Sequence, residues 1–325
     1  MIILNKNSCF VQCGGGWPEN IGNAFIDYGV KYILTKALGG ASGQIHCTSN
    51  ATNWIYNRYG SEKNYFNIAS KMRPDFFVFG GSMLDVDWFT SHESIYNNLV
   101  NSKTKVILLG IGGGDKYHEN EISAMRERLS KLNIFTFISR DETAYRCYHD
   151  LADHSYNGID CAFFLNDAFT PIHMDFGDYV VFNFDKMNSP NITVKEKILK
   201  IHHEPWKFAH NRIFSWWDFK KFVWNFIHRQ HNIISKNNFF SDIPDDYLNI
   251  YANCKVTYSD RIHACVATVS FGNSARLFTD SSRSLLFERV GIGNIKEKLV
   301  SLDKKAIDFE KGKEIKFLTE VLSKN

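Results

Sequence analysis

Residues 105–114 read KVILLGIGGG, an apolar run that ends in a cluster of glycines. Polar residues follow, and over residues 121–132 the side chains of Ile122, Met125 and Leu129 recur on one face of a helix. A buried strand, a glycine turn and an amphipathic helix in this order are typical of a parallel α/β sheet. The stretch therefore predicts one repeating unit of such a sheet.

The same alternation continues on both sides of this unit. Predicted strands cover residues 76–79, 134–139, 155–159, 179–184, 255–258 and 275–278. Predicted helices cover residues 24–34, 194–201, 247–253, 261–271 and 284–290, and a further helix ends at residue 148. This pattern predicts an α/β fold with helices on both faces of its sheets, and such sheets bind ligands beyond the carboxyl ends of their strands.

The length of the chain predicts two domains. Its 325 residues exceed the size at which one hydrophobic core usually stops growing. The alternation also breaks near residues 171–178. We expect one Rossmann-like domain over residues 1–172 and a second over residues 173–325, the second with a Trp-rich insertion at residues 206–240 and a C-terminal helical tail.

Composition and motif searches exclude several classes of function. The net charge of +3 is too small to predict a nucleic-acid partner. The seven cysteines form no CxxC pair, and we find neither a signal peptide nor 18 consecutive apolar residues, which favours a cytoplasmic protein. The twelve histidines show no H-x-x-x-H or H-E-x-x-H pattern, and G-x-S-x-G is absent, which argues against a metal site and a serine hydrolase.

Residues 206–240 break the alternation because they combine four tryptophans with lysine, arginine and histidine residues. Over residues 219–227 the apolar side chains recur with helical spacing, which predicts an amphipathic helix. Two interpretations stay open. The aromatic side chains pack between or beneath the domains, or they make a peripheral contact with the inner face of a membrane.

The tetrapeptide Asp260-Arg261-Ile262-His263 joins a predicted strand to a predicted helix. Asp260 has the chemistry of a helix N-cap, Arg261 carries a planar fork suited to a carboxylate or phosphate, and His263 titrates near neutral pH. A helix N-terminus also favours anions. The tetrapeptide predicts an anion site with its own proton donor; the alternative is a cap, a surface ion pair and a packed histidine.

Two further arginines follow predicted strands. Arg140 precedes Asp141, which resembles a helix cap, and Arg283 follows the last predicted strand. Three arginines at three strand ends predict a small, multiply charged anion, with structural ion pairs as the alternative. Glycine turns at residues 14–16 and 110–114 let the backbone approach a ligand closely, but the second lacks the Lys-Ser/Thr of a P-loop.

Six motifs follow one another along the chain. They are Asn20-Ile21-Gly22-Asn23, Phe79-Gly80-Gly81-Ser82-Met83-Leu84-Asp85, residues 110–114, Ser139-Arg140-Asp141-Glu142, Asp160-Cys161-Ala162-Phe163 and Asp260-Arg261-Ile262-His263. In this order and spacing they resemble the polysaccharide pyruvyl transferase family, and the last is similar to its Asp-Arg-x-His signature. The chain departs from the family at Asn23, where aspartate is frequent, at Ala144, where serine is common, and at Arg283, where lysine is frequent.

The resemblance implies two Rossmann-like domains in a GT-B-like arrangement, with the active site in the cleft between them and the N-terminal domain on the acceptor side. It implies transfer of the pyruvyl group of phosphoenolpyruvate onto a saccharide or lipid-linked oligosaccharide as a ketal, in cell-surface glycan biosynthesis, without metal or cofactor. The implied catalytic residues are His263 and Arg261. The implied donor-binding residues are Arg140, Arg261, His263, Arg283, Gly112 and Gly113. The structural or acceptor-binding candidates are Asn20, Gly22, Asn23, Gly80, Gly81, Asp141, Asp160 and Asp260.

Two other functions stay open on the sequence. A nucleotide-sugar glycosyltransferase of the same architecture would use the arginines to hold a diphosphate. A non-catalytic glycan-binding homologue would keep the fold, and the departures at Asn23 and Arg283 fit that alternative.

Overall fold

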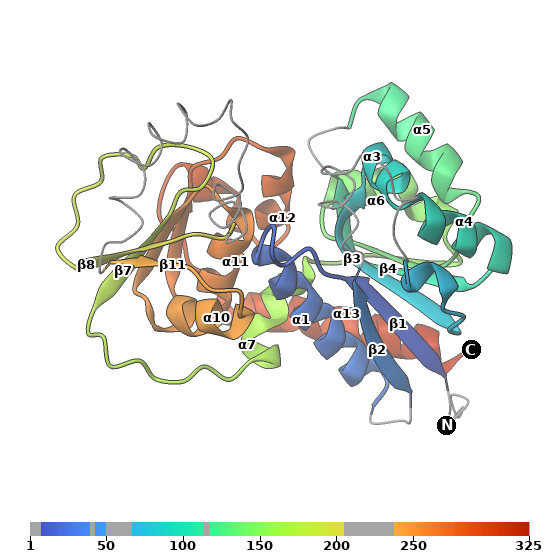
Figure 1. The fold of residues 1–325 in the computed structure, drawn as a ribbon, viewed down its shortest axis with the longest axis horizontal. Helices are drawn as coiled ribbons and strands as arrows, with labels where there is room; N and C mark the ends of the chain where they lie inside the picture. Colours follow the sequence, from blue (N-terminus) through green and yellow to red (C-terminus); the bar gives the residue numbers. More distant parts are fainter. Residues whose placement is uncertain (1–7, 40–42, 50–66, 114–116, 205–236, 325) are drawn as a thin grey trace, which may run out of the picture.

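The computed structural model describes residues 8–39, 43–49, 67–113, 117–204 and 237–324. Two groups of strands, each with its own helices, are visible in Figure 1. Most of the predicted Trp-rich insertion, including its predicted helix, lies outside the described residues. Within the described part of the chain, no helix is both long enough and apolar enough to cross a membrane.

The first sheet contains six parallel strands in the order β2-β1-β3-β4-β5-β6. They are β1 (Cys9–Gly14), β2 (Gln44–Ser49), β3 (Phe76–Leu84), β4 (Lys105–Gly113), β5 (Asn133–Ser139) and β6 (His154–Asn157). The longer helices of this half are α1 (Gly22–Ala37), α3 (Val86–Ser91), α4 (Glu93–Ser102), α5 (Glu119–Leu129) and α6 (Glu142–Tyr148). Short helical segments are η2 (Ala69–Lys71), η3 (His149–Leu151), η4 (Cys161–Phe164) and α7 (Leu165–Ala168). The predicted strands at residues 76–79 and 105–109 are confirmed, and both continue through their glycines.

Adjacent residues of β3 enter two different cores, because successive side chains of a strand point to opposite faces. Phe76 stacks on Phe10 at a ring distance of 4.7 Å and belongs to the core that contains Phe25 of α1. Phe77 belongs to the core on the other face, with Phe89 of α3. The continuous apolar run is therefore the signature of a strand that is buried on both faces.

The second sheet contains five parallel strands in the order β11-β10-β7-β8-β9. They are β7 (Tyr179–Asn183), β8 (Lys197–Ile201), β9 (Asn238–Phe239), β10 (Val256–Ser259) and β11 (Ser274–Leu277). The helical segments of this half are α10 (Pro244–Asn253), α11 (Ile262–Ser270), η6 (Ser282–Ser284), α12 (Leu285–Glu288), η7 (Gly293–Lys296) and α13 (Lys304–Ser323). Two parallel sheets with covering helices confirm the predicted α/β class.

The predicted helix at residues 194–201 is wrong, because Lys197–Ile201 forms β8. Leu199 and Ile201 are buried and Lys200 between them is exposed, so the apolar spacing fits a strand as well as a helix. Pairing with β7, in which Ile198 lies opposite Val180, decides the conformation.

Helix α13 returns from the second half of the chain to the first. It lies against α1 and β6, and Figure 1 shows it beside α1 between the two groups of strands. The domain boundary near residue 172 stays a prediction. The helical tail, which was assigned to the second domain, packs on elements of the first.

Candidate active site

The predicted site residues gather where parallel strands of both sheets end. The first half contributes Gly112 and Gly113 at the end of β4, Arg140 after β5 and Asp160 after β6. The second half contributes residues 260–263 after β10 and Arg283 after β11. Because η6, which carries Arg283, contacts β4, the carboxyl edges of the two sheets face each other.

Asp160 joins the two halves of the site. Its carboxylate lies 2.9 Å from Nη1 of Arg140 and 3.5 Å from Nε2 of His263. The Asp160 and Arg140 side chains are buried, whereas that of His263 is 15% exposed. Burial alone would raise the pKa of Asp160, but His263, Arg140 and the amide of Ala162 hold that pKa well below its usual range. An ionised carboxylate therefore lies beside the histidine.

Gly112 and Gly113 form the wall against which Arg140 lies. A Cβ on Gly112 would lie 2.4 Å from Nε of Arg140, so a larger residue would displace the guanidinium. Nη2 of Arg140 also donates to the carbonyl of Gly113 at 3.5 Å. Next to Arg140, Asp141 accepts from the amide of Ala144 at 2.7 Å, which confirms the predicted N-cap of α6. A direct contact of the two glycines with a donor stays a prediction.

The turn that precedes α1 reaches the second half of the chain. The amide of Ile21 donates to the carbonyl of His203 at 2.9 Å. A Cβ on Gly22 would lie 3.1 Å from Cβ of His263, so glycine lets the turn lie against the histidine. Oδ1 of Asn20 accepts from the amide of Gly22 at 3.2 Å and stabilises this turn.

The candidates Asn23, Gly80 and Gly81 make contacts that stabilise the fold around α1. Oδ1 of Asn23 accepts from the side-chain amide of Asn20 at 3.3 Å. A Cβ on Gly80 would lie 2.7 Å from Val30 of α1, and Gly81 has a positive φ of 84° next to Ile26 of the same helix. These two glycines allow α1 to pack closely on β3, and their role toward an acceptor stays a prediction.

Arg261 is already paired with carboxylates. Its Nε lies 3.1 Å from Oδ2 of Asp185, and its Nη2 contacts Glu204. The predicted N-cap role of Asp260 is wrong, because α11 begins after Arg261 without a side-chain cap. The carboxylate of Asp260 instead accepts from the amides of Lys186 and the following residue, at 2.7 and 2.9 Å. Strand β7 is parallel to β10 and ends beside it, so the amides of the loop after β7 lie within hydrogen-bonding distance of Asp260.

Lys186, in this loop, is a cation that our sequence interpretation missed. Burial lowers the pKa of Lys186, and the charges of Arg261 and Arg283 lower it further, while Asp260 and Glu204 act in the opposite direction. Lys186 therefore lies close enough to both arginines for their charges to act on it. A signal was available, because Lys186 follows a predicted strand as the three arginines do.

His203 differs from His263 in its surroundings. Its side chain is fully buried, with Nε2 2.5 Å from the hydroxyl of Tyr251, and burial lowers the pKa of His203 to about 3. His203 therefore stays neutral at physiological pH and acts as a packing and hydrogen-bonding residue. Over the described ranges, no group of three His, Cys, Asp or Glu side chains is placed to hold a metal ion.

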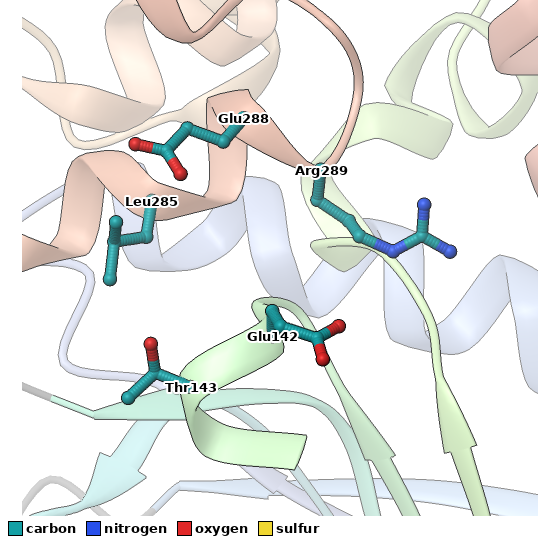
Figure 2. Close-up of a pocket in the computed structure, with 5 residues that line it drawn as sticks. All are labelled: Glu142, Thr143, Leu285, Glu288 and Arg289. Atoms are coloured by element: carbon teal, nitrogen blue, oxygen red, sulfur yellow. The ribbon is translucent and has the colours of Figure 1, made fainter. Parts of the chain in front are cut away.

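A pocket of about 250 Å³ lies between α6 of the first half and α12 of the second. It is lined by Glu142, Thr143, Leu285, Glu288 and Arg289. Figure 2 shows the α6 residues and those of the α12 region on facing sides of this pocket. Two of its lining residues are close in sequence to candidate site residues, because Glu142 follows Asp141 and Leu285 comes two residues after Arg283.

A family model described as "Polysaccharide pyruvyl transferase" matches residues 20–275, which is most of the chain. A search of curated proteins finds no match.

Two solved structures are similar over nearly the whole length. The S. aureus MnaA-UDP co-structure has a TM-score of 0.53 at 10% identity and covers 97% of this chain and 90% of its own. A putative UDP-N-acetylglucosamine 2-epimerase from Listeria monocytogenes has a TM-score of 0.52 at 10% identity and covers 98% and 91%. At this identity the likeness shows the fold alone, a GT-B-like pair of Rossmann-like domains.

Proposed function

The chain belongs to the polysaccharide pyruvyl transferase family, and from this premise we propose that it transfers the pyruvyl group of phosphoenolpyruvate to a saccharide as a ketal. The observation that carries the proposal is the proximity of Lys186 to Arg261 and Arg283, with His263 two residues after Arg261. Phosphoenolpyruvate carries a carboxylate and a phosphate, so it requires several cations and a proton donor in one place.

The cations of the site have two roles in this proposal. Arg140 is buried on Asp160, and Arg261 is held by Asp185 and Glu204. We assign these two arginines to positioning the site. We assign donor binding mainly to Lys186 and Arg283, because an anion bound there would offset the charges that lower the pKa of Lys186.

The reaction balances without any change of oxidation state. C3 of phosphoenolpyruvate gains a proton, and a sugar hydroxyl adds to C2 and loses its proton. The C2–O bond to phosphate then breaks, and inorganic phosphate leaves. A second hydroxyl of the sugar adds to C2, loses its proton and closes the cyclic ketal. Because no electrons are exchanged with a third molecule, the chemistry requires no redox cofactor.

His263 is the residue that moves protons in this scheme. Its Nε2 is enclosed against the ionised Asp160, so proton exchange with the substrate takes place at Nδ1. The carboxylate stabilises the imidazolium form when Nδ1 takes a proton from the hydroxyl. We assign the acceptor to the pocket between α6 and α12, because its two carboxylates and one hydroxyl suit the hydroxyl groups of a sugar.

The test is release of phosphate from phosphoenolpyruvate that depends on a sugar acceptor, with mass spectrometry of the acceptor. We expect a gain of one pyruvate ketal. His263→Ala is expected to lower the rate by ~10²–10⁴-fold, the usual contribution of acid–base catalysis. His149→Ala is the matched control, because His149 is exposed and lies on η3. A His263→Ala rate within a few-fold of wild type would contradict the assigned role.

A further inference from the structure

Helix α13 fastens the segment that carries Asp160. This helix begins at Lys304, beyond the family match at residues 20–275. Phe317 stacks on Tyr156 at a ring distance of 5.0 Å. Three further contacts follow along the same face of the helix.

The first of these contacts uses Glu310. Its Oε2 lies 2.9 Å from Nη2 of Arg289, which also donates to the carbonyl of Asn157 at 2.8 Å. On the far side of Asp160, Nζ of Lys311 donates to Asn166 at 2.6 Å and to Asp167 at 2.7 Å. The helix therefore holds the segment both before and after Asp160.

Glu314 makes the most direct contact. Its Oε2 accepts from the amide of Ile159 at 2.8 Å, and Ile159 directly precedes Asp160. A Cβ on Gly158 would lie 2.4 Å from the same oxygen, so glycine at this position makes room for the carboxyl group. The side chain of Glu314 is fully buried.

A buried carboxyl group is costly, so its presence needs a specific partner. Burial raises the pKa of Glu314 to about 8, against the lowering effects of the Ile159 amide and Arg289, while the charges of Asp160 and Glu310 act in the same direction as burial. At neutral pH the group is therefore mostly uncharged. It holds the amide of Ile159 without placing a second negative charge beside Asp160.

We propose that Glu314 is a positioning residue, which acts through the Ile159 amide to hold Asp160 against Arg140 and His263. The inference rests on the proposed function only for its kinetic consequence. The structural consequence is that a side chain from a distant helix holds the Ile159 amide. This consequence does not depend on any substrate.

The test compares three variants in the full chain. Glu314→Leu removes the acceptor, Glu314→Gln keeps a neutral acceptor, and Leu318→Ala weakens the packing of the same helix at a fully buried position without a contact to the Ile159 amide. For each variant, kcat of acceptor-dependent phosphate release is measured from pH 5 to 9 by a stopped assay. Amide hydrogen exchange of Ile159 is measured alongside, with the folded fraction checked by circular dichroism.

Glu314→Leu is expected to change the shape of the pH profile of kcat and to accelerate exchange at Ile159 about tenfold, which corresponds to ~1.4 kcal/mol for one lost hydrogen bond. Glu314→Gln is expected to keep the wild-type shape of the pH profile and the wild-type exchange rate at Ile159. Leu318→Ala is expected to lower stability and to leave the shape unchanged once kcat at each pH is divided by the folded fraction measured at that pH.

Two results would overturn the inference: an unchanged profile shape in Glu314→Leu when wild type is active, or unchanged exchange at Ile159. Wild-type protein that releases no phosphate with any acceptor contradicts the proposed function instead. In that case the exchange comparison among the three variants still decides whether Glu314 holds the Asp160 segment.

Discussion

Lys186 lies close to two arginines, and this position suits it to bind an anion. The residue as a whole is exposed, but desolvation of its ammonium group and the charges of two nearby arginines lower its pKa. An anion bound among these cations would reverse the repulsion and favour the charged lysine. The free energy gained in this way is available for substrate binding.

Lys186→Met is therefore expected to raise KM for phosphoenolpyruvate about tenfold, the low end for a hydrogen bond to a charged group (~1.4 kcal/mol). The effect on kcat should be smaller, because the reacting proton belongs to His263. Steady-state kinetics measures both constants. Lys313→Met, on the exposed face of α13, is the control and should leave both unchanged. Equal KM values for phosphoenolpyruvate in the two variants would show that Lys186 does not bind the donor.

Asp141 and Asp260 show why some residue roles are predictable and others are not. Both follow a strand and precede a helix. The cap made by Asp141 closes over three residues, so local sequence contains all its parts. Asp260 binds amides about 75 residues away, at the end of a neighbouring strand. No local pattern contains that partner.

At the scale of elements, α6 and α12 determine the shape of the pocket between the two halves. Thr143, at the start of α6, contributes a hydroxyl group to its lining, and Glu288 contributes a carboxylate from α12. Lys186, Arg261 and Arg283 are not among its lining residues. Changes to its lining should therefore affect the acceptor more than the donor.

Thr143→Val keeps the shape of the side chain and removes its hydroxyl group. We expect KM for the acceptor to rise about fivefold, as one neutral hydrogen bond of ~1 kcal/mol is lost, with KM for phosphoenolpyruvate unchanged. The measurement is a two-substrate kinetic analysis. Thr319→Val on α13 is a matched control that should leave both constants unchanged. A rise in the donor KM alone would place the acceptor elsewhere.

Helix α13 predicts a dependence of stability on pH. The pKa of Glu314 is raised to about 8 in the folded chain, above its ordinary value of 4.5, so the folded state keeps this proton while the unfolded state has lost it. The stabilisation is complete below about pH 4.5 and is lost as the pH rises through 8. The charged or titratable groups near Glu314 are Asp160, Cys161, Tyr156, Arg289 and Glu310.

Glu314→Gln is expected to remove this contribution. The free energy of unfolding of wild type should fall relative to that of the variant between pH 5 and 8. Urea unfolding at several pH values measures the difference. Parallel curves for the two proteins over this range would show that Glu314 is already ionised in the folded state.

At the scale of the whole molecule, the GT-B-like fold fits more than one donor, so ligand binding has to distinguish them. Saturating phosphoenolpyruvate is expected to raise the melting temperature by about 4 °C, because a ligand that binds the folded state alone stabilises it. UDP should produce no shift. Differential scanning fluorimetry measures both. Stabilisation by UDP and not by phosphoenolpyruvate would favour a nucleotide-sugar enzyme.

The class of fold, the order of most strands and helices, and the motifs that identify the family could all be predicted from the sequence. These features depend on local apolar spacing and on glycine positions, which are present in short windows of the chain. The strand at residues 197–201, the pairing of Arg261 with acids and the proximity of Lys186 to the arginines became visible in the folded chain alone. The same holds for the contact of Glu314 with Ile159, across 155 positions of the chain. Each of these outcomes depends on a partner from a distant segment, and the free energy of that contact outweighs the local preference.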